Sequence, residues 1–403
     1  MGWDLARWGG VWLAVASLQA SMLGAQRPTR ALPRADIEFP EPFTTISGVR
    51  ELPDGRVLVA DSREKTLQLL DLARGTSTAV GREGAGPNEW GLPSRLYALP
   101  GDSTLMIDAA NSRYFYIGPG GVPAGTARIP DLVPHFFSEL VGIDGAGRML
   151  FVASRRPARP ADGSTGVADV LLHDPRRGRV DTIATLAQPR GEVTAARILP
   201  GGRMRMVTNR PLAAHDLAGI APDGRIAIVR AASYRVEWIG ADGSRRVGPE
   251  APSPNIRVTE AEKQAFLAGQ ERAGPVIVRG PSGAAPPRTG APRGTGEPAR
   301  RPPAMRPSDV DALLDPDMTW PAVKPPFLVG AVHVAPDGRV WVLRTRAHDD
   351  PVPVYDVFDG AGRVAERIAL PAGTRLVGFG RGTVYLARTD GDDLVWLARV
   401  RSS

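Results

Sequence analysis

The 403-residue sequence contains no cysteine, only three lysines and only four asparagines. Without cysteine the chain can form no disulfide, iron–sulfur cluster, thiol nucleophile or cysteine-based zinc site. The scarcity of asparagine argues against a calcium site, because Ca²⁺ takes about six to eight oxygen ligands. After the first 25 residues, no stretch approaches the roughly 18 apolar residues that a membrane-spanning helix needs. We therefore expect no membrane span in the mature chain.

The net charge of +7 could indicate a nucleic-acid partner, but most of it lies in one segment. Residues 272–306 contain seven arginines and one glutamate, which is a net +6. The same segment contains eight prolines and six glycines, a composition that predicts a flexible tether. A nucleic-acid surface needs positive charge on a folded face. We therefore expect no nucleic-acid partner.

The N-terminal residues 1–25 have the layout of a secretory signal peptide. Arg7 precedes an apolar run from Trp8 to Leu18, and small residues lead to a cleavage site after Ala25. No cysteine follows that site, so the mature chain cannot carry a lipid anchor there. The segment predicts an exported bacterial protein, located in the periplasm or secreted.

One phrase recurs along the rest of the chain: an apolar strand, a tight turn with glycine, and a second aliphatic strand. Because the turn often contains Asp-Gly, we expect two-residue hairpins with both central residues at positive φ. The alternation after each turn predicts a strand with one apolar face. The phrase is found near residues 52–61, 99–108, 145–152, 221–229, 335–342 and 380–386.

Each phrase is followed by further strands, which gives four strands per unit. The shorter intervals between turns match the roughly 40–50 residues of a propeller blade. The chain is therefore predicted to be all-β, a six-bladed β-propeller of four-stranded antiparallel blades over residues 35–403. The last unit lacks one strand, and residues 36–39 could supply it. Ile37 and Phe39 would then lie on one face, and the two ends of the chain would close the ring.

Two longer intervals between turns predict insertions. An extra hairpin is expected at 197–209, between blades 3 and 4. A larger insertion, partly helical and partly disordered, is expected at 252–326, between blades 4 and 5. It begins with Thr259 and Glu262, which are spaced as a capping box at the start of a helix. The insertion is thus predicted to contain a helix over 259–270, the tether at 272–306 and a second helix over 308–314.

Two motifs carry a resemblance to a known family. The loop at 84–93 resembles the loop that precedes each repeat in NHL-type six-bladed propellers, and Val59-Ala60-Asp61 resembles that family's strand phrase. A second version of the phrase lies at 107–113. The resemblance covers residues 44–130 and implies an NHL-type or TolB-like propeller. Such propellers include protein binders, RNA binders and some metal-dependent enzymes, so the resemblance leaves the function open.

The candidate site residues are expected at the mouth of the central channel. His135 and His215 precede the first strands of blades 3 and 4, and Asp216 follows directly. Two histidines and a carboxylate can hold a metal ion. They share no local spacing motif, however, so we interpret them as unrelated surface or capping histidines and expect no metal site; the metal set is the alternative. Arg95, on the inner strand of blade 2, could contact an anionic ligand or pair with a neighbouring blade.

The sequence contains no G-x-S-x-G elbow, H-E-x-x-H pair, Walker loop or EF-hand spacing. We therefore expect a monomeric, non-catalytic binding or scaffold propeller without a cofactor. It would recognise a protein, peptide or saccharide through its top face. The alternative is a metal-dependent hydrolase or lyase with its site in the central channel.

Overall fold

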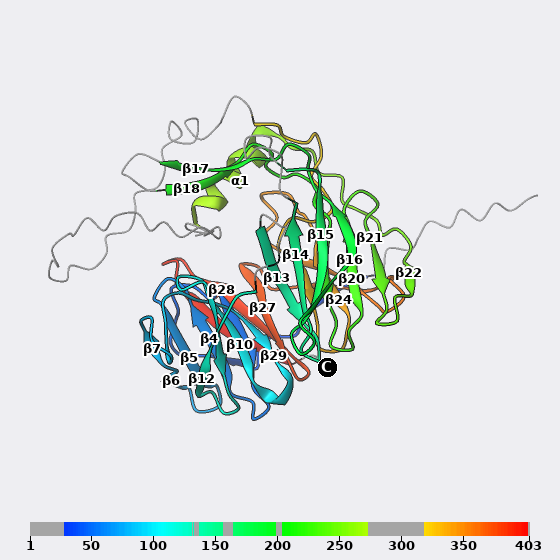
Figure 1. Ribbon diagram of the computed structural model, residues 1–403. Helices are drawn as coiled ribbons and strands as arrows, with labels where there is room; N and C mark the ends of the chain where they lie inside the picture. The colour runs from blue at the N-terminus through cyan, green and yellow to red at the C-terminus, as the bar shows by residue number, and fades with distance from the viewer. Residues whose placement is uncertain are drawn as a thin grey trace, which may run out of the picture.

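A computed structural model of the protein describes residues 28–130, 132, 137–155, 164–198, 204–272 and 318–401. Over these residues the chain forms the six blades of a ring, which confirms the predicted β-propeller (Figure 1). Blade 1 comprises β3 (Gly48–Glu51), β4 (Val57–Asp61), β5 (Thr66–Asp71) and β6 (Thr76–Ala79). Blade 2 comprises β9 (Pro93–Ala98), β10 (Thr104–Asp108), β11 (Arg113–Ile117) and β12 (Pro123–Arg128). Blade 3 comprises β13 (Phe137–Ile143), β14 (Met149–Ser154), β15 (Val167–Asp174) and β16 (Arg179–Ala187).

The second half of the ring follows the same order, with the inner strand first. Blade 4 comprises β19 (Leu217–Ile220), β20 (Ile226–Arg230), β21 (Arg235–Ile239) and β22 (Arg245–Val247). Blade 5 comprises β23 (Val332–Val334), β24 (Val340–Leu343), β25 (Val354–Phe358) and β26 (Val364–Ala369). Blade 6 comprises β27 (Thr374–Gly380), β28 (Thr383–Thr389), β29 (Val395–Arg401) and the N-terminal β2 (Ile37–Glu38).

The turn after the inner strand of blade 1 differs from the predicted two-residue hairpin. In blade 1 the Leu52 carbonyl accepts a hydrogen bond from the Gly55 amide at 2.9 Å, and only the glycine has a positive φ, of 86°. Pro53 suits the first central position of a type I turn, and the Asp54 carboxylate accepts the Arg56 amide at 3.0 Å. The aspartate therefore needs no left-handed backbone, and the prediction of two positive φ angles is wrong for this turn.

Apolar side chains fill the space between neighbouring blades. In β4, Val57 and Val59 belong to the core shared with blade 6, whereas Leu58 and Ala60 belong to the core shared with blade 2. All residues of β4 are buried. The prediction of one apolar face for such strands is wrong, because a strand with a blade on each side is buried on both faces.

The two ends of the chain meet in blade 6, which confirms the predicted closure. β2 pairs antiparallel with β29, and the Phe39 amide donates to the Leu397 carbonyl at 2.9 Å. Phe39 is only 1% exposed, and Ile37 packs against the same core. The closing strand therefore contributes both backbone hydrogen bonds and buried apolar surface.

Two further contacts, which the sequence did not indicate, strengthen this joint. A short strand β1 (Thr29–Ala31) adds a fifth, parallel strand to blade 5, and Leu32 is buried beside it. Between blades 1 and 6, the Glu51 carboxylate accepts hydrogen bonds from the hydroxyls of Tyr385 (2.5 Å) and Thr383 (2.7 Å). The N-terminal segment thus fastens two blades.

Both insertions rise from one face of the ring, which we call the top face. Each blade has four antiparallel strands, so the outer strand ends where the inner strand began, and the chain enters every inner strand from this face. The predicted hairpin between blades 3 and 4 is confirmed as β17 (Thr194–Ile198) and β18 (Met204–Thr208). The first predicted helix is confirmed as α1 (Glu260–Arg272), between blades 4 and 5 (Figure 1).

The start of α1 departs from the predicted capping box. The Thr259 hydroxyl accepts the Glu262 amide at 3.3 Å, as expected. The Glu262 carboxylate does not return the bond; it accepts the His348 amide at 2.9 Å and forms an ion pair with Lys324. Because Glu262 is buried, a cationic partner stabilises it better than an amide of its own helix. The helix is thereby fixed to blade 5.

The second predicted helix, at 308–314, and the tether beyond residue 272 lie outside the described residues. No helix within the described part of the chain combines the length and apolarity needed to cross a membrane.

We predict that Phe39→Ser lowers the free energy of unfolding by about 3–5 kcal/mol, because it removes a buried aromatic ring from the joint. Chemical denaturation should also become less cooperative, since the ring can open at blade 6. Glu41→Ser, at an exposed position in the same segment, is the matched control and should change the stability by less than about 0.5 kcal/mol. Equal transitions for both variants would show that the segment does not close the ring.

Candidate functional site

Four side chains from the inner strands form what we call the channel cluster: Arg95, Glu139, His333 and Arg375. They lie on β9, β13, β23 and β27, which belong to blades 2, 3, 5 and 6. Arg95, Glu139 and Arg375 lie within the first three residues of longer strands and therefore toward the top face, whereas His333 is the middle residue of the three-residue β23. Two of these inner strands, β13 and β27, are marked near the centre of Figure 1.

Arg95 forms an ion pair with Glu139 on the neighbouring blade. The Tyr97 hydroxyl bridges the same two blades and donates to the Leu140 carbonyl at 2.6 Å. The Arg95 side chain is nevertheless 52% exposed. Burial acts to lower the pKa of Arg95, but the Glu139 carboxylate and Tyr97 outweigh it and raise the pKa. The guanidinium is therefore fixed at one end and open to solvent at the other.

His333 lies on the opposite side of the ring from Arg95, since blades 2 and 5 are separated by two blades in either direction. Burial lowers the pKa of His333 to about 4, and the charges of Arg95 and Arg375 lower it further in the same direction. Its ring lies 6.2 Å from that of Tyr355, measured between centroids. The imidazole is therefore neutral at neutral pH and within the field of both guanidiniums.

The structure places His215 at the base of the extra hairpin, against the connection between blades 3 and 4. Its Nδ1 contacts the Gln188 side-chain oxygen at 2.5 Å, and its Nε2 lies 3.4 Å from the Glu192 carboxylate. Burial lowers the pKa of His215, and the charges of Glu192 and Asp216 only partly oppose this. Both ring nitrogens therefore have protein partners.

The Asp216 side chain binds backbone amides. Its carboxylate accepts the amides of Ala187 and Ala231, each at 2.9 Å, and the Arg230 guanidinium at 2.8 Å. Asp61 in blade 1 likewise accepts the amides of Thr44 and Thr45. A buried aspartate that collects backbone donors is thus a recurring device that ties a blade to the connection entering it. Such a carboxylate has few lone pairs left for a metal ion.

The alternative metal set depends on His135, which lies outside the described residues. Within the parts of the chain that the structure describes, no group of three or more His, Asp or Glu side chains is placed to hold a metal ion. His215 and Asp216 are adjacent in sequence, but their side chains bind different partners. The metal site at the channel mouth therefore remains an alternative hypothesis.

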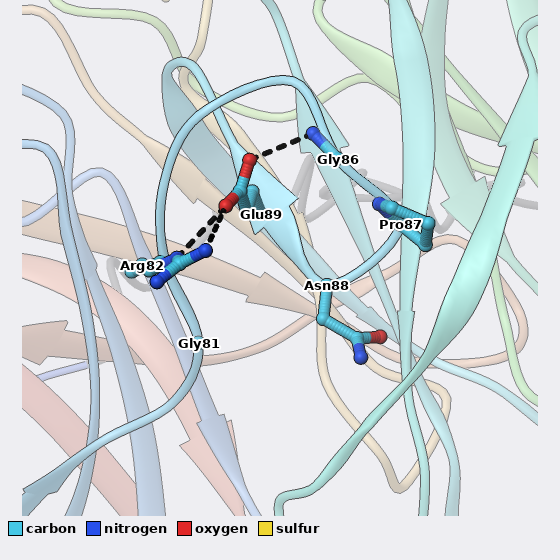
Figure 2. Close-up of a pocket in the computed structure, with 6 residues that line it drawn as sticks. All are labelled: Gly81, Arg82, Gly86, Pro87, Asn88 and Glu89. Atoms are coloured by element: carbon cyan, nitrogen blue, oxygen red, sulfur yellow. Dashed lines mark hydrogen bonds and ion pairs between the residues drawn. The ribbon is translucent and has the colours of Figure 1, made fainter.

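A shallow hollow of about 530 Å³ lies at the connection between blades 1 and 2 (Figure 2). It overlaps the loop at 84–93 that the sequence analysis singled out. It is bordered by β7 (Arg82–Glu83) and β8 (Glu89–Trp90). The Glu89 carboxylate accepts the Gly86 amide and the Arg82 guanidinium, both at 2.8 Å, and these bonds lower the pKa of Glu89. Trp90 is buried against Phe115. The conformation of this loop is thus held by its own polar contacts, by the buried Trp90, and by Arg113 of blade 2, which donates to the carbonyls of Ala85, Gly86 and Glu89.

Comparison with known proteins gives no family model and no curated protein that matches the chain. Among solved structures, it is similar to the calcium-binding protein regucalcin from Agrobacterium tumefaciens, with 12% identity over 93% of this chain and 97% of the other, and a TM-score of 0.40. It is also similar to a protein of the duf4221 family from Bacteroides vulgatus, with 8% identity over 91% and 96%, and a TM-score of 0.46. A streptogramin B lyase matches with 10% identity over 91% and 87%, and a TM-score of 0.38. At these values the likenesses carry no argument about function.

Sequence reasoning singled out Arg95 but missed its association with His333 and Arg375. Both missed residues lie on inner strands, a few residues before the glycine turn of their blade. That position relative to the turn was the available signal. Nothing in the sequence says which side chains of an inner strand meet those of the opposite blade.

We predict that Asp216→Asn lowers the free energy of unfolding by about 2–4 kcal/mol, because it leaves buried donors unsatisfied. Asp223→Asn, in an exposed turn of the same blade, is the matched control and should have a small effect. The loss in Tm for Asp216→Asn should be the same with EDTA and with added Zn²⁺ or Ca²⁺. Stoichiometric metal in the native protein that is lost in this variant would contradict the structural role.

The depressed pKa of His333 predicts a pH-dependent stability. The unfolded chain binds a proton at this histidine near pH 6.5, whereas the folded chain does so only near pH 4. His333 therefore destabilises the fold progressively as the pH falls through this window, by at most about 3 kcal/mol. His333→Gln should gain stability relative to the native protein by that amount between pH 7 and pH 4, measured by chemical denaturation. A difference that does not change with pH would mean that the histidine protonates normally.

Proposed function

We propose that the protein is a non-catalytic binding propeller that recognises a protein, peptide or saccharide through its top face. The observation that carries this proposal is a wall on that face, formed by β17, β18 and α1, which we call the top-face wall. The Thr319 amide, after the insertion, donates to the Asn209 carbonyl, after the hairpin, at 2.8 Å. The bases of the two insertions are therefore joined beside the channel mouth.

The top-face wall is anchored to the ring by buried groups. Leu267 of α1 is 2% exposed, and the Phe266 ring stands perpendicular to Trp320 at 5.8 Å between centroids. Glu262 binds Lys324 and the His348 amide, as described above. A surface that is already ordered loses little conformational entropy when a partner binds. This favours recognition at the wall.

The engagement of the candidate residues supports binding over catalysis. His215 has protein partners at both ring nitrogens, and Asp216 holds backbone amides. A general base or nucleophile needs a free pair of electrons facing a substrate. Binding of a partner at the top-face wall, in contrast, does not require a free electron pair on His215 or Asp216.

We also propose that the protein is exported, on the basis of residues 1–25. Their charged start, apolar run and small residues at the cleavage site have the order of a signal peptide. The absence of cysteine is compatible with an oxidising compartment. The top face would then meet its partner outside the inner membrane.

The test is a binding screen against a glycan array and a peptide-display library. We predict at least one saturable ligand whose affinity falls at least tenfold in Glu262→Ala, which releases α1 from blade 5. Glu260→Ala is the matched control, because this residue lies in the same helix and is 75% exposed. Equal ligand affinity in the two variants would show that the top-face wall does not take part in binding. Chemical turnover of a ligand together with stoichiometric metal would favour the hydrolase or lyase alternative.

A further inference from the structure

The channel cluster carries more positive than negative charge. Arg95 and Arg375 are cationic, Glu139 is the only carboxylate, and His333 is neutral at neutral pH. Glu139 is already paired with Arg95. The Arg375 guanidinium donates to the neutral carbonyl of Ile46 at 2.8 Å, and no carboxylate within the described residues pairs with it. Among the described residues, one positive charge at the channel mouth therefore has no carboxylate partner.

Elsewhere in the ring, arginines that reach the interior are matched by buried aspartates. Arg50, on the inner strand of blade 1, also lacks a carboxylate pair, and burial lowers its pKa despite the charges of Asp102 and Glu51. Within the described residues, Arg375 therefore departs from this pattern, as Arg50 does. The matched pairs are Arg113 with Asp108, Arg230 with Asp216, and Arg344 and Arg367 with Asp356.

The cluster spans the ring. Arg95 and His333 belong to opposite blades, and Arg375 belongs to the blade next to His333. Arg375 also bonds to Ile46 at the start of blade 1, so its guanidinium is held toward the joint of blades 6 and 1. The inner strands of a propeller surround its central axis, so residues on β9, β23 and β27 border the same space. The three groups therefore share the space at the axis.

The two guanidiniums are open to water but surrounded by protein. Arg375 is exposed by surface area, and Arg95 is 52% exposed. Even so, burial lowers the pKa of Arg375. This combination is typical of a solvated channel, where an accessible charge is poorly solvated and attracts a counter-ion more strongly than on an open surface.

The His333 ring adds a hydrogen-bonding group to this space. Within the described residues, its nitrogens make no hydrogen bond, and its ring lies beside that of Tyr355. A neutral imidazole can donate one N–H to an anionic oxygen, and an arginine fork can donate two. The excess positive charge disfavours a metal cation at the same place.

We propose that the channel cluster binds a small oxyanion, a carboxylate or phosphate group of a ligand, through Arg375, Arg95 and His333. The inference rests on the proposed function, since it names the chemistry of the ligand that the top face would receive. Arg375 supplies the free charge, Arg95 supplies donors that Glu139 leaves unused, and His333 supplies one N–H from the opposite side.

The test is isothermal titration of the full chain with inorganic phosphate and, separately, with citrate, at constant ionic strength set by NaCl. We expect saturable binding of at least one of the two, and the arm that responds identifies phosphate or carboxylate chemistry. Arg375→Gln should weaken it at least tenfold, and His333→Gln about three- to tenfold. Arg381→Gln removes the same charge from an exposed turn of the same blade and should leave the affinity unchanged.

Circular dichroism must show that Arg375→Gln is folded. If it is not, Arg95→Gln replaces it, with the same tenfold loss expected. Equal losses in Arg375→Gln and Arg381→Gln, or no binding of either anion by the native protein, would overturn the inference. Glu262→Ala should retain anion binding. A failure of the top-face wall and a failure of the anion site therefore give different results.

Discussion

Closure of the ring is the constraint on which the rest of this structure depends. Each blade has two apolar faces, and the six cores lie between blades. An open ring would expose one face of blade 1 and one of blade 6, because no blade can bury both of its faces alone. The joint therefore combines several kinds of contact: the β2–β29 pairing, the buried Phe39, and the Glu51 carboxylate between the two blades. Convergence at the axis adds steric limits, since a Cβ on Gly219 would lie 2.6 Å from Val334 of the next blade.

Much of this fold could be predicted from the sequence, because a propeller repeats one local pattern. The glycine turns marked the six blades, and the leftover segment at 36–39 marked the closing strand. Local chemistry was less easily predicted. Asp54 was expected at positive φ, but its backbone has a negative φ and its carboxylate accepts a hydrogen bond from the Arg56 amide. Glu262 was expected to cap its own helix, but it binds Lys324, which lies far along the chain. The sequence pattern shows which residues are polar and does not show their distant partners.

The candidate site was less predictable than the fold for the same reason. Arg95 could be placed on an inner strand, whereas its partner Glu139 on the neighbouring blade became evident only in the structure. Arg95, His333 and Arg375 lie on the inner strands of blades 2, 5 and 6. Their common position at the axis depends on how these three blades are arranged in the ring. His215 and Asp216 were chosen for their chemistry and their place before an inner strand. In the structure, that place is a connection between blades, where polar groups fix the backbone. Residues with metal-binding chemistry can therefore serve the architecture alone.

Native-state hydrogen exchange at the joint tests the central claim most directly. The amides of Phe39 and Phe43 donate to carbonyls of β29, at Leu397 and Val395. If the N-terminal segment holds the ring closed, these amides should exchange only through global unfolding, with the same free energy as amides in the fully buried β4. Exchange at the joint that is orders of magnitude faster than in β4 would mean that the segment frays while the ring persists. That result would contradict the account.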